Sequence, residues 1–278
     1  MADEDKYPSE TGRRRFVKGV VGAGSLAAVG TGAAAAINTA TSPTGAGGGI
    51  TTFKGIANTD GPAPRGMPIV PVEIQDDGTI KGVWPEVKEV EEAGRTIQIA
   101  EMELGGVTYT SEWFQYCGVQ TYAGIQPSYE SDNLFKSAPS PPYAWQEEVY
   151  GEGDPINIRD FQDYRTFSTG IGKAGLGKPA MCTWRSEEGE NTIPVQVLRA
   201  PQVERLAQED EFMAAATDQG VMAWLDKCTH FCCVPAYKAY AQSANFGAAN
   251  KVYCQCHQSV YDPFEIVEKS FVALPRPE

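Results

Sequence analysis

Histidine is nearly absent from this chain of 278 residues, which contains two, His230 and His257. Both lie in or beside the one region where cysteine is concentrated. Any chemistry that needs an imidazole must therefore take place there. The clustered cysteines also indicate a site rather than scattered use of cysteine in a core. Five of the seven cysteines belong to this region: Cys228, Cys232, Cys233, Cys254 and Cys256.

Basic residues are also scarce. The chain has 23 Lys and Arg against 36 Asp and Glu, a formal net charge of −13. Such a chain creates no field that attracts phosphate, which disfavours nucleic acid as a partner. Its hydrophobic content of 42% is ordinary for a folded protein and argues against disorder.

Long apolar runs are missing except near the N-terminus. Residues 19–37 carry no charge and follow the sequence RRRFVK at 13–18, the layout of a targeting segment. The basic part resembles a twin-arginine export signal. As a helix, the apolar part would span about 28 Å, close to the roughly 30 Å of a membrane core. We therefore predict a cytoplasmic basic region at 1–18, a transmembrane anchor or cleaved Tat signal at 19–40, and the remainder on the extracytoplasmic side.

The rest of the chain divides by composition. Residues 41–65 are predicted to be a flexible linker, either a spacer or a hinge, because TSPTGAGGG has no periodicity. From 66 to 278 the signals are mainly β, with an insertion of little regular structure at about 116–177. Strands are predicted at 68–74, 96–104, 107–110, 180–184, 194–198 and 221–225, and a helix at 201–217.

Two short motifs carry the chemistry. Residues 228–233 read CTHFCC, and residues 254–262 read CQCHQSVYD. The C-x-H and C-x-x-H pairs offer two thiolates and two imidazoles, a set that suits soft or borderline metals. A structural zinc site uses the same ligand types, so a zinc protein stays open on these residues alone.

The motifs resemble those of the Rieske family, in particular the quinol-oxidising branch of cytochrome bc complexes, whose boxes read C-T-H-L-G-C and C-P-C-H-G-S-x-Y-D. The resemblance covers about 35 residues directly. Ten positions agree: Cys228, Thr229, His230 and Cys233 in the first box, and Cys254, Cys256, His257, Ser259, Tyr261 and Asp262 in the second.

The resemblance implies one [2Fe-2S] cluster. Its metal ligands would be Cys228 and Cys254 on one iron and His230 and His257 on the other, with a disulfide between Cys233 and Cys256. Ser259 and Tyr261 would donate hydrogen bonds to a cluster sulfide and to a cysteine sulfur. The implied fold is mainly β, a Rieske-type antiparallel β-sandwich with a small cluster-binding subdomain at about 226–264 and one N-terminal transmembrane helix.

The chain also departs from the family. Phe231 and Cys232 replace Leu and Gly, so that either Cys232 or Cys233 could pair with Cys256. Gln255 and Gln258 replace Pro and Gly, which predicts a less rigid second loop. Residues 239–249 are predicted to be an insertion between the boxes, and the early end of the chain predicts a missing or replaced last strand. Outside the boxes, Cys117 and Cys182 are either free thiols or a second disulfide.

The implied function is electron transfer. The resemblance predicts a subunit, not catalytic alone, of a quinol:acceptor oxidoreductase complex. His257 and His230 would be its catalytic residues, because a free imidazole nitrogen gains affinity for a proton when the bound iron is reduced. The expected partners are quinol, a cytochrome b-type membrane subunit and a cytochrome or small copper-protein acceptor, in a dimeric complex held in the cell membrane by a single pass.

An alternative is the Rieske small subunit of an exported, arsenite-oxidase-like molybdenum enzyme or of a nitrate-respiration chain. Ring-hydroxylating oxygenases are disfavoured, because their second iron needs further histidines and none remain.

Overall fold

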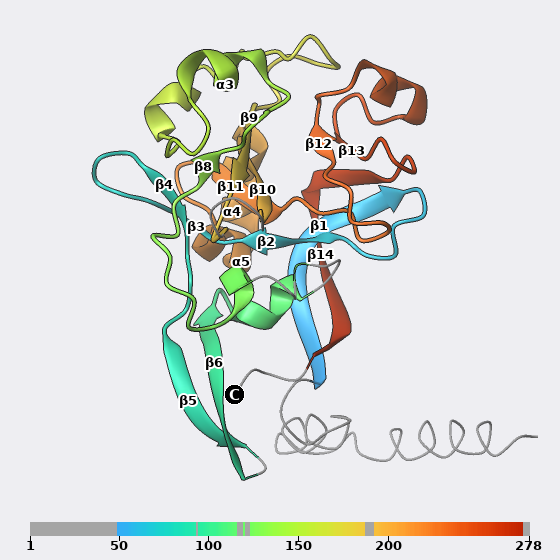
Figure 1. Ribbon diagram of the computed structural model, residues 1–278. Coiled ribbons are helices and arrows are strands. Elements are labelled where there is room, and N and C mark those ends of the chain that lie inside the picture. Colours follow the sequence, from blue (N-terminus) through green and yellow to red (C-terminus); the bar gives the residue numbers. More distant parts are fainter. Residues whose placement is uncertain (1–48, 93, 116–118, 120–122, 187–191, 275–278) are drawn as a thin grey trace, which may run out of the picture.

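The computed structural model describes residues 49–278 except 93, 116–118, 120–122, 187–191 and 275–278 (Figure 1). The predicted basic region at 1–18, the predicted anchor or signal at 19–40 and the first part of the predicted linker lie outside these residues. Among the described helices, none has the length and apolar character needed to cross a membrane.

The described part is mainly β, as predicted, and its strands pair antiparallel. The largest sheet has nine strands in the order β12-β13-β14-β1-β2-β11-β10-β9-β8. Their bounds are β1 (Gly49–Asp60), β2 (Met67–Val70), β8 (Lys136–Ser137), β9 (Lys178–Thr183), β10 (Pro194–Arg199), β11 (Val221–Leu225), β12 (Ala236–Tyr237), β13 (Val252–Tyr253) and β14 (Val260–Ala273).

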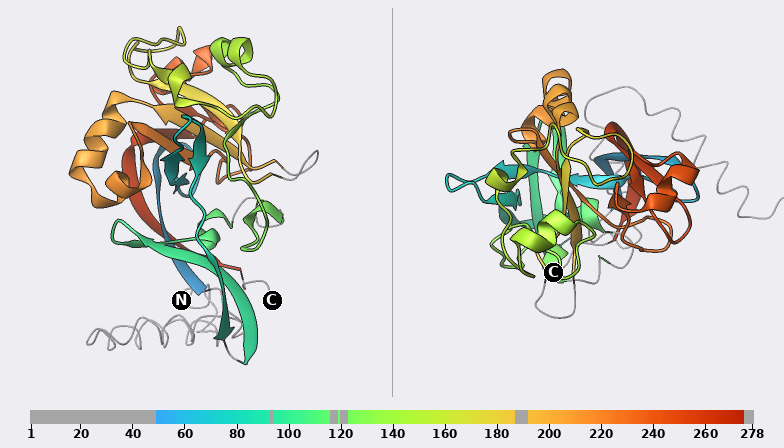
Figure 2. Two further views of the ribbon diagram at one scale, coloured as in Figure 1. Left: turned by 90° about the vertical axis from the view of Figure 1, so that its left-hand side faces the viewer. Right: turned by 90° about the horizontal axis from the view of Figure 1, so that it is seen from above.

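Two smaller sheets complete the β structure. One pairs β3 (Val72–Ile74) with β4 (Ile80–Gly82), and the other joins β5 (Val87–Glu92), β6 (Arg95–Leu104) and β7 (Val107–Thr110). Figures 1 and 2 show β5 and β6 extending away from the body as a ribbon, and the β12–β13 region on the opposite side from β3 and β4.

The core lies over the middle of the nine-stranded sheet. Every residue of β10 and of β11 is buried, which fits their nearly continuous apolar sequences. Large aromatic side chains pack together against these strands, among them Trp113, Phe114 and Trp184. The apolar strands that the sequence predicts are therefore the ones that hold the centre of the molecule.

The helix predicted at 201–217 is two helices, α4 (Pro201–Glu209) and α5 (Glu211–Ala216). Asp210 separates them in an extended conformation, with φ −130° and ψ 125°. Its carboxylate accepts a hydrogen bond of 2.8 Å from the N–H of Met213, the arrangement of a helix N-cap. The prediction missed the break because the apolar spacing continues across it.

Similarly, the strand predicted at 68–74 is interrupted at Pro71, which has no N–H to donate and lies between β2 and β3.

The predicted linker at 41–65 is wrong where the structure describes it, because Gly49–Asp60 forms β1. This strand pairs with β14 from Gly49 opposite Ala273 to Asp60 opposite Val260. The sequence analysis also did not predict β14, the last described strand. Pro263 obscured it in the sequence; a register shift between Ile56 and Ala57 accommodates the irregular stretch.

The region predicted to have little regular structure contains only short elements where it is described. Between 123 and 161 these are the 3₁₀ helices η3 (Ala123–Ile125) and η4 (Ile158–Phe161), β8, and α3 (Ala144–Val149). Two more 3₁₀ helices are η1 (Ser111–Phe114) and η5 (Ala241–Phe246), the latter between β12 and β13 within the predicted insertion at 239–249. The larger domain division stays a prediction.

Candidate metal centre

Two loops with the same backbone geometry meet at one side of the sheet. The first, residues 228–233, follows β11, and the second, residues 254–259, joins β13 to β14. In the first loop, the N–H of Cys228 donates to the carbonyl of Cys233 at 2.7 Å. In the second, the N–H of Cys254 donates in the same way to the carbonyl of Ser259 at 2.9 Å. The two cysteines at the loop starts are thus presented by matching turns.

A left-handed residue closes each turn. Cys232 and Gln258 have φ values of 60° and 63°. Their N–H groups donate to the carbonyls of Cys228 at 3.1 Å and Cys254 at 3.0 Å. These are the two positions at which this chain replaces the glycines of the Rieske boxes. The turn is therefore kept without glycine, at the cost that a left-handed conformation carries for a residue with a side chain.

Cys228 and Cys254 are buried free thiols that contact each other. The pKa of Cys228 is lowered to about 5, first because the Cys254 thiol donates a hydrogen bond to it and then because Tyr261 and the N–H groups of His230 and Phe231 also donate. The same contact, together with burial, raises the pKa of Cys254. The contact therefore favours the ionised form of Cys228 and the protonated form of Cys254. Both sulfur atoms are soft donors for a metal.

The two imidazoles lie beside each other, with ring centroids 4.7 Å apart and ring planes at 78°. His230 Nδ1 is buried and has no hydrogen-bond partner. A buried nitrogen without a partner is costly unless another group binds it. Because His257 is exposed, one imidazole is partly covered by protein while the other meets solvent. The two loops therefore offer two sulfur and two nitrogen donors to a metal centre.

A different sulfur group, formed by Cys233, Cys254 and Cys256, has its sulfur atoms within 4.8 Å of one another and could also hold a metal by distance. However, Cys233 and Cys256 are joined by a disulfide. Disulfide sulfurs are not thiolates and do not ligate as such. We therefore favour the set of two cysteines and two histidines.

The disulfide joins the two loops, and Cys233 with Cys256 is the pair that the resemblance implies. Cys232 does not compete for Cys256, because Cys256 is bonded to Cys233 and Cys232 is itself disulfide-bonded. Cys182 is a free thiol in β9, and burial raises its pKa. Cys117 lies outside the described residues.

Two buried side chains with hydroxyl groups, Tyr261 and Ser259, belong to this region. The Tyr261 hydroxyl donates to Cys228 Sγ at 3.2 Å. Ser259 Oγ accepts from the N–H of Ala63 at 3.2 Å. Since this contact uses an oxygen lone pair of Ser259, its hydroxyl hydrogen remains for another acceptor.

A third segment, residues 61–66 between β1 and β2, touches both loops, and the sequence analysis missed it. Gly61 has a φ of 83°, and a Cβ there would come 2.6 Å from Ser259 Cα. The Thr229 hydroxyl donates to the carbonyl of Arg65 at 2.6 Å. The sequence GPAPRG was the available signal, because two prolines restrict the backbone of a turn.

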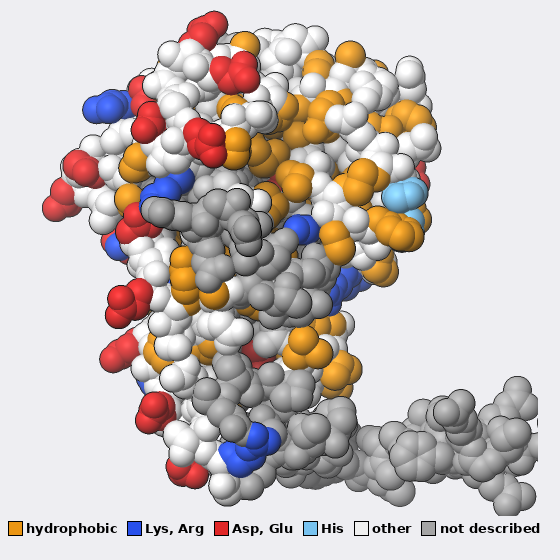
Figure 3. All heavy atoms as spheres, viewed as in Figure 1, with side chains coloured by type: hydrophobic (Ala, Val, Ile, Leu, Met, Phe, Trp, Pro, Cys, Tyr) orange, Lys and Arg blue, Asp and Glu red, His pale blue; other side chains and the backbone are white. Residues whose placement is uncertain are grey.

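The surface around the exposed imidazole is apolar. The side chain of Phe231 is 65% exposed and that of Val234 43% exposed. The Phe231 ring lies 4.6 Å from the His230 ring and 4.9 Å from the His257 ring, between centroids. Figure 3 shows the histidine surface at the edge of the molecule with hydrophobic side chains around it.

Asp226 lies close to the thiols in sequence and is completely buried. Burial raises its pKa well above the ordinary value; the Trp224 indole N–H, which donates to it at 3.1 Å, opposes this rise, and negative charge on Cys228 adds to it. The carboxyl group is therefore favoured in its neutral form.

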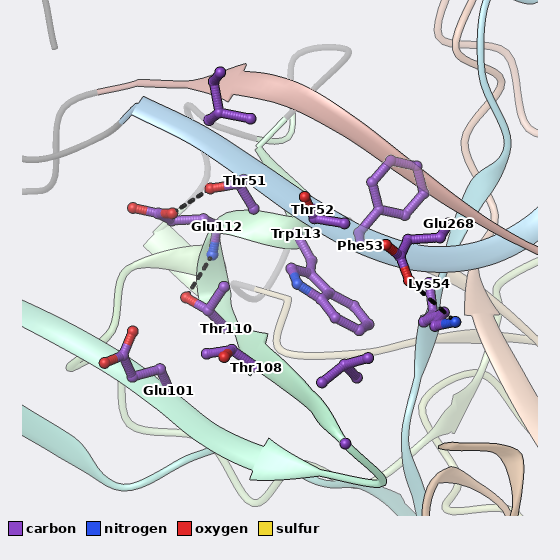
Figure 4. A pocket seen from close by; sticks show the side chains of 13 residues that line it. Thr51, Thr52, Phe53, Lys54, Glu101, Thr108, Thr110, Glu112, Trp113 and Glu268 are labelled. Atoms are coloured by element: carbon purple, nitrogen blue, oxygen red, sulfur yellow. Dashed lines mark hydrogen bonds and ion pairs between the residues drawn. The ribbon is translucent and has the colours of Figure 1, made fainter. Parts of the chain in front are cut away.

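A larger hollow lies away from the two loops. It has a volume of about 430 Å³ and lies between the start of β1 and the β6–β7 hairpin (Figure 4). The Thr51 hydroxyl donates to the Glu112 carboxylate there, and Lys54 pairs with Glu268 at 3.2 Å. None of the four candidate ligands, Cys228, His230, Cys254 and His257, lines it, so we place the chemistry at the two loops.

Comparison of the chain with protein-family models, with curated proteins and with solved structures found no match. The functional argument therefore rests on the motif residues and their geometry.

Proposed function

We propose that this chain is a Rieske-type iron–sulfur subunit that accepts electrons from a membrane quinol with coupled proton transfer and passes them to a cytochrome or small copper protein. The observation that carries the proposal is the pair of matching loops that brings Cys228, Cys254, His230 and His257 together, with a buried Nδ1 lacking a partner. When bound, a [2Fe-2S] cluster with two histidine ligands supplies one-electron transfer at about −150 to +300 mV.

Each motif residue has a proposed role. Cys228 and Cys254, which contact each other, would be the thiolate ligands of one iron, and His230 and His257 would hold the other. His257 is exposed, which supports its role as the residue that accepts the quinol proton. Tyr261 and Ser259 direct hydroxyl groups to the centre and favour the more negative, reduced form.

The finer fold and location belong to the same proposal. We propose a Rieske-type β-sandwich at 66–278, extended by β1, with its cluster-binding subdomain at about 226–264. An N-terminal anchor would hold it on the extracytoplasmic side, beside a cytochrome b-type subunit in a dimeric complex. The disulfide between Cys233 and Cys256 supports an exported domain, since disulfides persist in oxidising compartments.

The metal assignment is tested by metal analysis and electron paramagnetic resonance of the full chain after reduction with dithionite. We expect iron, acid-labile sulfide and a rhombic [2Fe-2S] signal. Cys228→Ser should abolish the signal, whereas Cys182→Ser, which changes a buried thiol outside the loops, should keep it. Stoichiometric zinc without an EPR signal would overturn the assignment.

The quinol role is tested separately on membranes that contain the full complex. Duroquinol should reduce the centre, and the midpoint potential should fall as the pH rises, because the reduced state takes up a proton. A potential independent of pH, with the EPR signal present, would leave the metal centre in place and contradict the proton-coupled function.

A further inference from the structure

A second cavity, of about 290 Å³, lies apart from the two loops, between the start of α3 and residues 167–169. Its walls carry the aromatic rings of Tyr143, Trp145 and Phe167. Ser168 and Thr169 add hydroxyl groups. The cavity therefore combines flat apolar surfaces with a few polar groups, the usual make-up of a small-molecule site.

One cation lines this cavity. Lys238 is 2% exposed, although it carries a long charged side chain. Its ammonium donates to the carbonyl of Lys173, and burial lowers its pKa. An ammonium has three protons to donate, so one carbonyl leaves donor capacity unused.

Lys238 also lacks a counter-ion. None of the ion pairs among the described residues includes it, and none of the described lining residues is an Asp or Glu. A cation shielded from water with no opposite charge is unfavourable. This absence is notable in a chain with a net charge of −13.

A second cation, Lys178, contacts the aromatic rings of the cavity wall. Lys178 Nζ lies 4.1 Å from the Trp145 ring centroid and 5.1 Å from that of Phe167. Unlike Lys238, it has a carboxylate partner, Asp163, at 2.9 Å. Lys238 Nζ lies 6.0 Å from the Tyr237 ring centroid and donates to the Lys173 carbonyl, but among the described residues it has no carboxylate partner.

We propose that this cavity binds a small planar carboxylate, with its carboxylate on Lys238 and its flat apolar part against Trp145 and Phe167. The anion supplies the missing counter-ion, and a charge-assisted hydrogen bond to an ammonium is stronger than a neutral one. The aromatic walls select a flat ligand over a compact inorganic anion. The site is independent of the metal centre and of the proposed electron transfer.

Benzoate is the probe and benzamide its neutral control, each titrated into the full chain by isothermal calorimetry. We expect saturable benzoate binding that is at least about tenfold tighter than benzamide binding. Equal binding of the two probes, or no benzoate binding at millimolar concentration, overturns the proposal without any variant.

Two variants of Lys238 test whether its positive charge binds the carboxylate. Lys238→Met keeps the aliphatic stem and should weaken benzoate binding at least about tenfold, while Lys238→Arg should retain most of it. Unchanged affinity in Lys238→Met would overturn the role of Lys238. If this variant does not fold, Phe167→Ala serves instead, and an affinity equal to that of the unchanged chain would contradict the proposed wall.

Discussion

Tyr261 places its hydroxyl 3.2 Å from Cys228 Sγ, in a site where neither residue is more than 1% exposed. A hydrogen bond to a sulfur ligand is stronger when the centre carries more negative charge, so it stabilises the reduced state. Under the proposed function, Tyr261→Phe should lower the midpoint potential by about 60 mV, a tenfold change in a one-electron equilibrium. Redox titration followed by EPR measures the shift.

Tyr237→Phe is the matched control for this substitution. Tyr237 is as buried as Tyr261, but its hydroxyl donates to the carbonyl of Leu176 at 3.0 Å. It should leave the potential unchanged. Equal shifts in both variants would mean that general packing, rather than the contact with Cys228, sets the potential.

Gln258 tests the cost of its left-handed turn. Its φ is 63° and its side chain is exposed, so replacement by glycine removes strain and few contacts. After allowance for the greater freedom of glycine in the unfolded chain, Gln258→Gly should be about 0.5–1 kcal/mol more stable than Gln258→Ala. Urea unfolding followed by circular dichroism measures this difference.

The neighbouring Gln255 provides a control in the same loop. It is exposed and does not have a positive φ. Gln255→Gly should therefore be no more stable than Gln255→Ala. A glycine advantage at both positions would contradict strain at Gln258.

Among the elements, the break between α4 and α5 depends on one side chain. Asp210 accepts the N–H of Met213 at 2.8 Å and so caps α5. Asp210→Ala should cost about 1 kcal/mol in the free energy of unfolding, whereas Asp210→Asn, which can still accept this hydrogen bond, should cost much less. Thermal unfolding of the two variants compares them; equal losses would argue that the charge of Asp210, not its capping bond, is what matters.

The elements also show what the sequence could predict. β10 and β11 were found because their apolar residues are continuous and bounded by turns. β1 was missed although its buried residues alternate at Gly49, Thr51 and Phe53, because glycine and threonine carry little hydrophobic signal. Each strand of the β1–β14 pair becomes recognisable only through its partner, which lies at the other end of the described chain.

The candidate metal centre could also be predicted only in part from the sequence. The ligand types and their spacing could be read from the sequence, since two motifs hold both histidines. The contact of residues 61–66 with both loops could not, because Thr229 and Arg65 are far apart along the chain. Nor could the pairing of Cys233, because adjacent cysteines have the same local sequence and differ only in where the fold directs them.

At the scale of the whole molecule, the cysteines can be counted. Cys182, Cys228 and Cys254 are free, Cys233 pairs with Cys256, and Cys232 is disulfide-bonded as well.

We therefore expect the denatured, metal-free chain to take up at least three alkyl groups before reduction, at Cys182, Cys228 and Cys254, and seven after it. Mass spectrometry measures both numbers, and a non-reducing peptide map identifies the linked pairs. Five labels before reduction would contradict a second disulfide.

The β1–β14 pair also fixes the distance between its start at Gly49 and the two loops. It runs from Gly49 opposite Ala273 at one end to Asp60 opposite Val260, beside the candidate metal centre, at the other. With a rise of about 3.4 Å per residue, this pair of strands is about 37 Å long. If the described part rotated as one body about Gly49 by about 30°, the candidate metal centre would move through about 20 Å, so a small change of angle at one end becomes a large displacement at the other.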